Sequence, residues 1–103
     1  MQELTVNLPG RSYQITIGTN HWSASLTKIL QERNARRVVV VTNDALQRLY
    51  PDLLATELQQ NGFETATCVI PDGEQHKTLA DLTRIYDFLL ERSANRKTWL
   101  IAF

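Results

Sequence analysis

The chain opens with two short runs in which apolar and polar residues alternate. The first run covers residues 4–8 and the second covers residues 13–17, and a Pro-Gly-Arg-Ser turn cluster separates them at positions 9–12. Alternation with a period of two is typical of a strand that buries one face. Two such runs around a turn therefore predict an antiparallel β-hairpin with one buried face.

Apolar residues recur every three or four positions in three later stretches, which predicts helices. The first stretch covers residues 21–31 and the last covers residues 78–92. The middle stretch covers residues 44–60, and Pro51 divides it into two segments. Since proline suits the first turn of a helix, Pro51 is expected to begin the second segment.

Polar residues mark the ends of these predicted helices. Asn43 and Asp44 offer an N-cap for the middle stretch, and the Asn-Gly pair at 61–62 offers a C-terminal stop. Thr78 and Asp81 approximate a capping box, with Asp in place of the usual Glu. The cap signals thus agree with the boundaries that the apolar spacing predicts.

Three strands are predicted between and after the helices. Residues 37–42 contain an unbroken β-branched run, and residues 63–70 and 98–103 follow as second and third strands. Continuous apolarity is typical of strands covered on both faces, as in parallel sheets. A hairpin followed by alternating helices and strands predicts an α/β fold with a parallel sheet and right-handed crossovers.

The densest chemistry lies in the loop Pro-Asp-Gly-Glu-Gln-His-Lys-Thr-Leu at residues 71–79. This loop follows the second predicted parallel strand, whereas Asn43 follows the first. The carboxyl ends of parallel strands share one edge of the sheet, where nucleotides and substrates bind in open α/β folds. We therefore expect the two segments to meet across one crevice, although they are far apart in the sequence.

Several residues of these segments suit a nucleotide. Glu74 can accept hydrogen bonds from two ribose hydroxyls, and Lys77 offers a positive charge for a phosphate or a carbonyl. Gly73 permits a positive φ and close backbone approach. The alternative is an ordinary strand-to-helix connection, in which Asp72 forms an Asx-type turn and Asn43 only caps a helix.

The remaining reactive side chains form no recognisable site. His76 has no His, Cys or carboxylate at metal-ligand spacing, so a solvated loop histidine is favoured over a ligand, and His21 is interpreted in the same way. Cys68 is the single cysteine, and its place inside a predicted strand favours a packed, unreactive thiol. The sequence predicts no metal ligand and no catalytic residue.

The charges balance in this chain of 103 residues, with 11 Lys and Arg against 11 Asp and Glu. The longest basic cluster along the sequence is Arg36-Arg37, which argues against a nucleic-acid partner because such binding needs clustered cations. No stretch of about 18 apolar residues is present to span a membrane, and the N-terminus lacks a signal-peptide pattern. A single cysteine fits a reducing compartment, so a cytoplasmic location is expected.

The third predicted strand, at residues 98–103, is the last element of the sequence. A buried parallel strand normally leads into a further turn and helix that cover the sheet. The pattern therefore predicts a truncated, incomplete domain with a partly bare sheet.

Three segments together resemble 3-dehydroquinate synthases. They are RSYQITIG at residues 11–18, VVVVTNDAL at residues 38–46 and, above all, PDGEQHKTL at residues 71–79. The last run is the hallmark of that family, and His76 is a mild departure because the family usually has Tyr or another bulky residue there. The resemblance covers the whole chain but only the first part of a family member.

The resemblance implies that residues 1–103 are a partial N-terminal NAD-binding domain with a Rossmann-like parallel sheet. It implies that the helical C-terminal domain, which holds the substrate and a divalent zinc or cobalt ion, lies outside this chain. It also implies NAD contacts from residues of both polar segments: Asn43, Asp72, Gly73, Glu74, Gln75, His76 and Lys77.

In the family, NAD-dependent oxidation and re-reduction accompany the loss of phosphate from the sugar acid DAHP, which yields 3-dehydroquinate. The resemblance thus implies a lyase of the shikimate pathway of aromatic amino acid biosynthesis, in which this portion alone lacks turnover and a homodimer is possible. One alternative is a fragment of a glycerol-dehydrogenase-like NAD enzyme, although those enzymes carry a different loop at residues 71–79. The other is a non-enzymatic α/β module that dimerises through its bare sheet face.

Overall fold

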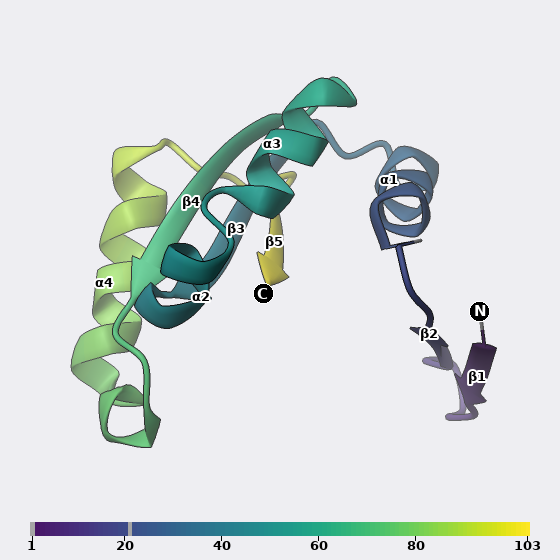
Figure 1. The fold of residues 1–103 in the computed structure, drawn as a ribbon, viewed down its shortest axis with the longest axis horizontal. Helices are drawn as coiled ribbons and strands as arrows, with labels where there is room; N and C mark the ends of the chain where they lie inside the picture. Colours follow the sequence, from purple (N-terminus) through teal and green to yellow (C-terminus); the bar gives the residue numbers. More distant parts are fainter. Residues whose placement is uncertain (1, 21) are drawn as a thin grey trace.

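Two sheets organise the computed structural model, which describes residues 2–20 and 22–103 (Figure 1). In the first sheet, β1 (Gln2–Val6) and β2 (Tyr13–Ile17) pair antiparallel, so the predicted hairpin is confirmed. The second sheet is parallel and has the strand order β4-β3-β5. Its strands are β3 (Arg37–Asn43), β4 (Glu64–Ile70) and β5 (Trp99–Ala102).

Helices connect the parallel strands in the predicted alternation. Figure 1 shows α3 and α4 on opposite sides of β4, as expected when one right-handed crossover runs from β3 to β4 and the next runs in the opposite direction, from β4 past β3 to β5. The helices are α1 (Trp22–Glu32), α2 (Asp44–Leu49), α3 (Leu53–Gln60) and α4 (Leu79–Glu91), with a 3₁₀ turn, η1 (Glu74–His76), between β4 and α4. No helix in the described part of the chain combines the length and the apolarity that crossing a bilayer requires.

The core lies along the central strand. Val38 and Val40 of β3 are almost completely buried, and they belong to one cluster with Leu30 of α1 and Leu58 of α3. Val39, whose side chain points to the other face of the strand, is also buried. The prediction that β3 is covered on both faces is therefore confirmed.

The predicted burial is wrong for the hairpin, whereas β5 shows the partly bare sheet that the sequence predicts. Leu4 and Ile15 of the hairpin are 46% and 42% exposed, and Leu100 of β5 is 53% exposed. Within residues 2–20 and 22–103, no sheet or helix packs on the exposed apolar residues of the hairpin, and β5 is an edge strand that pairs with β3 alone. An apolar pattern marks a face suited to burial, but a covering element must be present to bury it.

The start of α3 also differs from the expectation. Pro51 lies in a turn before the helix, and Asp52 precedes Leu53 in a left-handed conformation with φ of 52°. Pro51 is therefore not the first residue of the helix. The C-terminal stop is as predicted, because α3 ends at Gln60 and Gly62 has φ of 91°.

Candidate functional site

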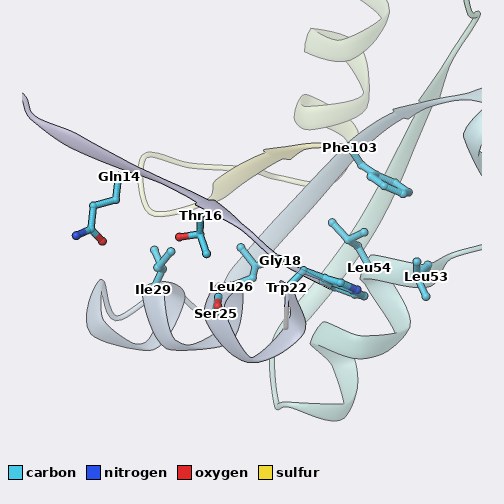
Figure 2. A pocket seen from close by; sticks show the side chains of 10 residues that line it. All are labelled: Gln14, Thr16, Gly18, Trp22, Ser25, Leu26, Ile29, Leu53, Leu54 and Phe103. Atoms are coloured by element: carbon cyan, nitrogen blue, oxygen red, sulfur yellow. The ribbon is translucent and has the colours of Figure 1, made fainter. Parts of the chain in front are cut away.

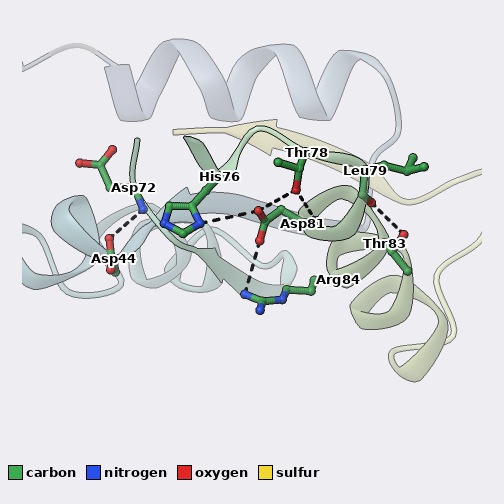
Figure 3. Close-up of polar contacts among 8 residues, drawn as sticks. All are labelled: Asp44, Asp72, His76, Thr78, Leu79, Asp81, Thr83 and Arg84. Carbon is green, nitrogen blue, oxygen red and sulfur yellow. Dashed lines mark hydrogen bonds and ion pairs between the residues drawn. The ribbon is translucent and has the colours of Figure 1, made fainter. Parts of the chain in front are cut away.

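The two polar segments meet at the carboxyl edge of the parallel sheet. Asn43 at the end of β3 lies opposite Ile70 at the end of β4 in the strand register. Just beyond, the backbone N–H of Asp72 donates a hydrogen bond to Oδ1 of Asp44 at 3.1 Å (Figure 3). The predicted adjacency of the two segments is thus confirmed.

Asn43 acts as a helix cap. Its Oδ1 accepts a hydrogen bond from the backbone N–H of Leu46 at 2.8 Å, which satisfies one free donor of the first turn of α2. The side-chain amide N–H groups of Asn43 have no partner among the described residues. Capping fixes the orientation of this side chain and leaves its donors available at the edge of the sheet.

Gly73 lets the loop turn where β4 ends. Its φ is 108°, and a Cβ built there would lie 2.5 Å from Oε1 of Gln75. The positive φ disfavours a side chain at this position, whereas the Gln75 side chain could move away from a Cβ. The glycine holds the backbone of the loop close to the Gln75 side chain.

Glu74 and Lys77 form an ion pair across the η1 turn. The Lys77 Nζ donates to Oε1 of Glu74 at 2.8 Å, and both side chains are mostly exposed. The hydrogen bond with Glu74, together with its negative charge, raises the pKa of Lys77. A ligand that used either side chain would have to share or break this pair, which costs little because exposed ion pairs are weak.

Asp81 is the centre of a second set of polar contacts (Figure 3). The Thr78 hydroxyl donates to Oδ2 of Asp81 at 3.0 Å and accepts from the Asp81 N–H at 3.3 Å, which confirms the predicted cap of α4. Nδ1 of His76 lies 3.8 Å from the same carboxylate oxygen, and Arg84 lies 3.4 Å from the other one. The half-exposed His76 is thus held against the start of α4, a contact that its sequence neighbours did not indicate.

The strand order places a topological switch point between β3 and β5. In open α/β sheets, ligands bind outside the carboxyl ends of the strands at such a point. The rings of Tyr50, after α2, and Phe103, after β5, lie there with centroids 6.3 Å apart. Tyr50 is not among the site residues predicted from the sequence, because only the fold brings it beside the end of β5.

An apolar hollow of about 440 Å³ lies between β2, α1, α3 and Phe103 (Figure 2). Trp22, Leu26 and Leu54 are among the residues that line it, and no charged side chain contributes. Its polar lining side chains are Gln14, Thr16 and Ser25, and most of the remaining lining is apolar. Trp22, which lines the hollow, is 39% exposed.

Metal-binding chemistry does not fit the described residues. No group of three or more His, Cys, Asp or Glu side chains in residues 2–20 and 22–103 could hold a metal ion. Cys68 is buried in β4, and its burial raises the pKa of the thiol, which disfavours the thiolate needed for reactivity. The packed, unreactive thiol that the sequence predicts agrees with this environment.

The chain is similar in sequence to one known synthase and in fold to another. No family model matches the chain. Its curated relatives include the 3-dehydroquinate synthases of Dehalococcoides mccartyi (36% identical over 102 residues), Enterococcus faecalis (37% over 100) and Neisseria meningitidis (37% over 102). Each match covers at least 97% of this chain but only 28% of the relative.

Solved structures with a similar fold include two crystal structures of 2-deoxy-scyllo-inosose synthase. Their TM-scores are 0.80 and 0.79 over 96% of this chain, at 14% sequence identity, and the match covers 26% and 28% of those chains. One of these structures is a complex with carbaglucose-6-phosphate, NAD+ and Co2+. At this identity the likeness establishes the fold alone. The sequence matches are more specific than the likeness in fold. Over nearly its whole length, this chain is homologous to a part of 3-dehydroquinate synthase.

Proposed function

We propose that the chain binds NAD at the carboxyl edge of its parallel sheet, as the nucleotide-binding portion of a 3-dehydroquinate synthase. The observation that carries this proposal is the hydrogen bond between Asp72 and Asp44, which holds the polar loop against the end of β3. The switch point of the sheet lies at the same edge. The relatives at 36–37% identity support the choice of enzyme.

Each polar residue has a role that its position allows. Glu74, which is largely exposed, would accept hydrogen bonds from the ribose hydroxyls. Lys77 would exchange part of its contact with Glu74 for a phosphate oxygen. The free amide donors of Asn43 and the backbone at Gly73 would contact the nucleotide from two sides, with Asp72, Gln75 and His76 completing the loop.

Bound NAD would supply a reversible hydride acceptor to the complete enzyme, which we propose converts DAHP to 3-dehydroquinate with loss of phosphate. The divalent metal of that reaction would need ligands from outside this chain, since the described residues provide no suitable group. The chain spans 28% of the length of its relatives, and the property that we propose for it is NAD binding. A homodimer and a cytoplasmic location remain predictions from the sequence.

Thermal unfolding in the presence of NAD tests this proposal. A ligand that binds only the folded state at about ten times its Kd stabilises it by about 1.4 kcal/mol, which raises the Tm measurably. We expect NAD to raise the Tm of the chain and Glu74→Gln to reduce this shift. Glu91→Gln is the matched control, because Glu91 is an exposed carboxylate at the far end of α4.

Two results would contradict the proposal. One is an NAD-dependent shift that is the same in Glu74→Gln and in the unaltered chain. The other is a stable dimer with no response to NAD, which would favour the non-enzymatic dimerisation module instead.

A further inference from the structure

The opposite edge of the sheet, at the amino ends of the parallel strands, carries a cluster of positive charge. Three separate segments converge on one hollow of about 790 Å³: the end of α1 with the start of β3, the start of β4, and the loop before β5. We call this hollow the basic groove, and its cations and aromatic residue are Arg33, Arg36, Arg37, Arg96, Lys97 and Trp99.

The sequence does not show this cluster. Arg36-Arg37 is its longest basic run, and the residues of the loop before β5 lie far from it along the chain. The parallel register brings the segments together, because Val38 pairs with both Thr65 of β4 and Trp99 of β5. The expectation that cations are not clustered in this protein is therefore wrong for the folded chain.

Arg37 differs from the other four cations because it has structural partners. It forms an ion pair with Glu64 at 3.6 Å and donates a hydrogen bond to the carbonyl of Ser93 at 2.9 Å. It also donates to the carbonyl of Arg92, so its guanidinium satisfies free carbonyl groups after the end of α4. Arg37 thereby ties β3 to the end of α4.

The other four cations have no ion pair within residues 2–20 and 22–103, and their positions are exposed: Arg33, Arg36, Arg96 and Lys97. Glu64 is the one acidic residue that lines the groove, and it already pairs with Arg37. Like charges held close together repel one another, and this repulsion is relieved when an anion binds between them. Guanidinium groups suit phosphate in particular, because they can donate two parallel hydrogen bonds to its oxygens.

We propose that the basic groove binds a small anion that carries two or more phosphate groups. The unpaired cations come from two separate segments, Arg33 and Arg36 before β3 and Arg96 and Lys97 before β5, so the groove offers two pairs of cations to a ligand with two phosphates. A small ligand is favoured over a nucleic acid because the cations converge on one hollow while the chain as a whole has no net charge. Trp99, which is 36% exposed, adds an aromatic surface beside the cations.

Titration with inorganic tripolyphosphate tests the proposal, with Trp99 fluorescence in a Trp22→Phe background as the readout. We expect saturable binding that weakens as salt rises from about 50 to about 200 mM. The double variant Arg96→Gln/Lys97→Gln should bind about tenfold more weakly or worse, since it loses two charge-assisted contacts. The control is Arg11→Gln/Lys28→Gln, which removes the same charge from exposed positions outside the groove.

Equal weakening in both double variants would overturn the proposal, because it would show a general effect of charge. Absence of saturable binding would also overturn it. So would tighter binding of a single-stranded oligonucleotide than of tripolyphosphate, which would indicate a nucleic-acid surface. The groove and the Glu74 loop lie at opposite ends of the strands. The NAD-dependent shift in Tm should therefore be the same in Arg96→Gln/Lys97→Gln as in the unaltered chain. Failure of one proposal would thus leave the other standing.

Discussion

The backbone N–H of Asp72 donates a hydrogen bond to Oδ1 of Asp44 at 3.1 Å, across 28 positions of the sequence. Asp44 is the first residue of α2, and Asp72 lies in the loop after β4. The contact therefore couples the ends of two neighbouring strands at the proposed NAD site. Loss of this hydrogen bond should increase the mobility of the loop more than it destabilises the core.

We expect Asp44→Ala to speed the hydrogen exchange of the Asp72 amide and to lower the free energy of unfolding by no more than about 1 kcal/mol, because the bond is solvent-exposed. Asp44→Asn keeps an oxygen acceptor and should largely preserve protection of the amide. Asp87→Ala, at an exposed site of α4, is the control for the loss of a carboxylate. Unchanged Asp72 exchange in Asp44→Ala would show that the contact does not order the loop.

Asn43→Ala should lower the free energy of unfolding by about 1 kcal/mol, because the first turn of α2 loses its side-chain cap. Asn43→Asp retains an acceptor for the Leu46 N–H and should stay close to the unaltered chain in stability. It also removes the amide donors proposed to contact NAD, so it should weaken NAD binding. Urea unfolding and NAD titration of the two variants separate the capping role from the binding role.

Leu58→Ala should destabilise the fold by about 2–5 kcal/mol, the usual cost of truncating a buried leucine. Leu58 is 1% exposed within the cluster that joins α1, α3 and β3. Leu90→Ala is the matched control on α4, where the side chain is 75% exposed, and its effect should stay within about 0.5 kcal/mol. Similar losses in the free energy of unfolding in the two variants would show that Leu58 is not part of the buried core.

Cys68 should react slowly with thiol reagents in the folded chain and rapidly after unfolding, because burial raises the pKa of its thiol. The folded thiol keeps its proton at pH values where the unfolded thiol has lost it. The folded state therefore binds more protons, and stability falls as the pH rises above the ordinary thiol pKa of 9.0 towards the raised value.

The predicted fall in stability with rising pH can be checked by measuring the free energy of unfolding at several pH values. Cys68→Ala removes the titrating group, so its stability should decline less between pH values below and above the ordinary thiol pKa than that of the unaltered chain. The comparison uses the change with pH within each protein, which separates titration from the packing cost of the substitution. An equally steep decline in both proteins would assign the effect to other groups.

Local signals in the sequence determined the order of elements and most of their ends. The β-branched run of β3, the Asn43 and Thr78 caps and the stop at Gly62 all have the structural roles predicted for them. These roles depend on contacts within a few residues, or on the intrinsic conformation of one residue, so neighbouring residues are sufficient to specify them.

Only the tertiary structure decided which apolar faces are covered and which distant charges meet. The periodicity of the hairpin and of β5 indicates a face suited to burial, yet Ile15 and Leu100 remain exposed because none of the elements that the structure describes lies over them. The basic groove arises from the parallel strand order β4-β3-β5, whereas the sequence already predicts that the loop with Asp72 meets the end of β3. Strand order brings together residues that are far apart in the chain, and the pattern of any single segment contains no information about that order.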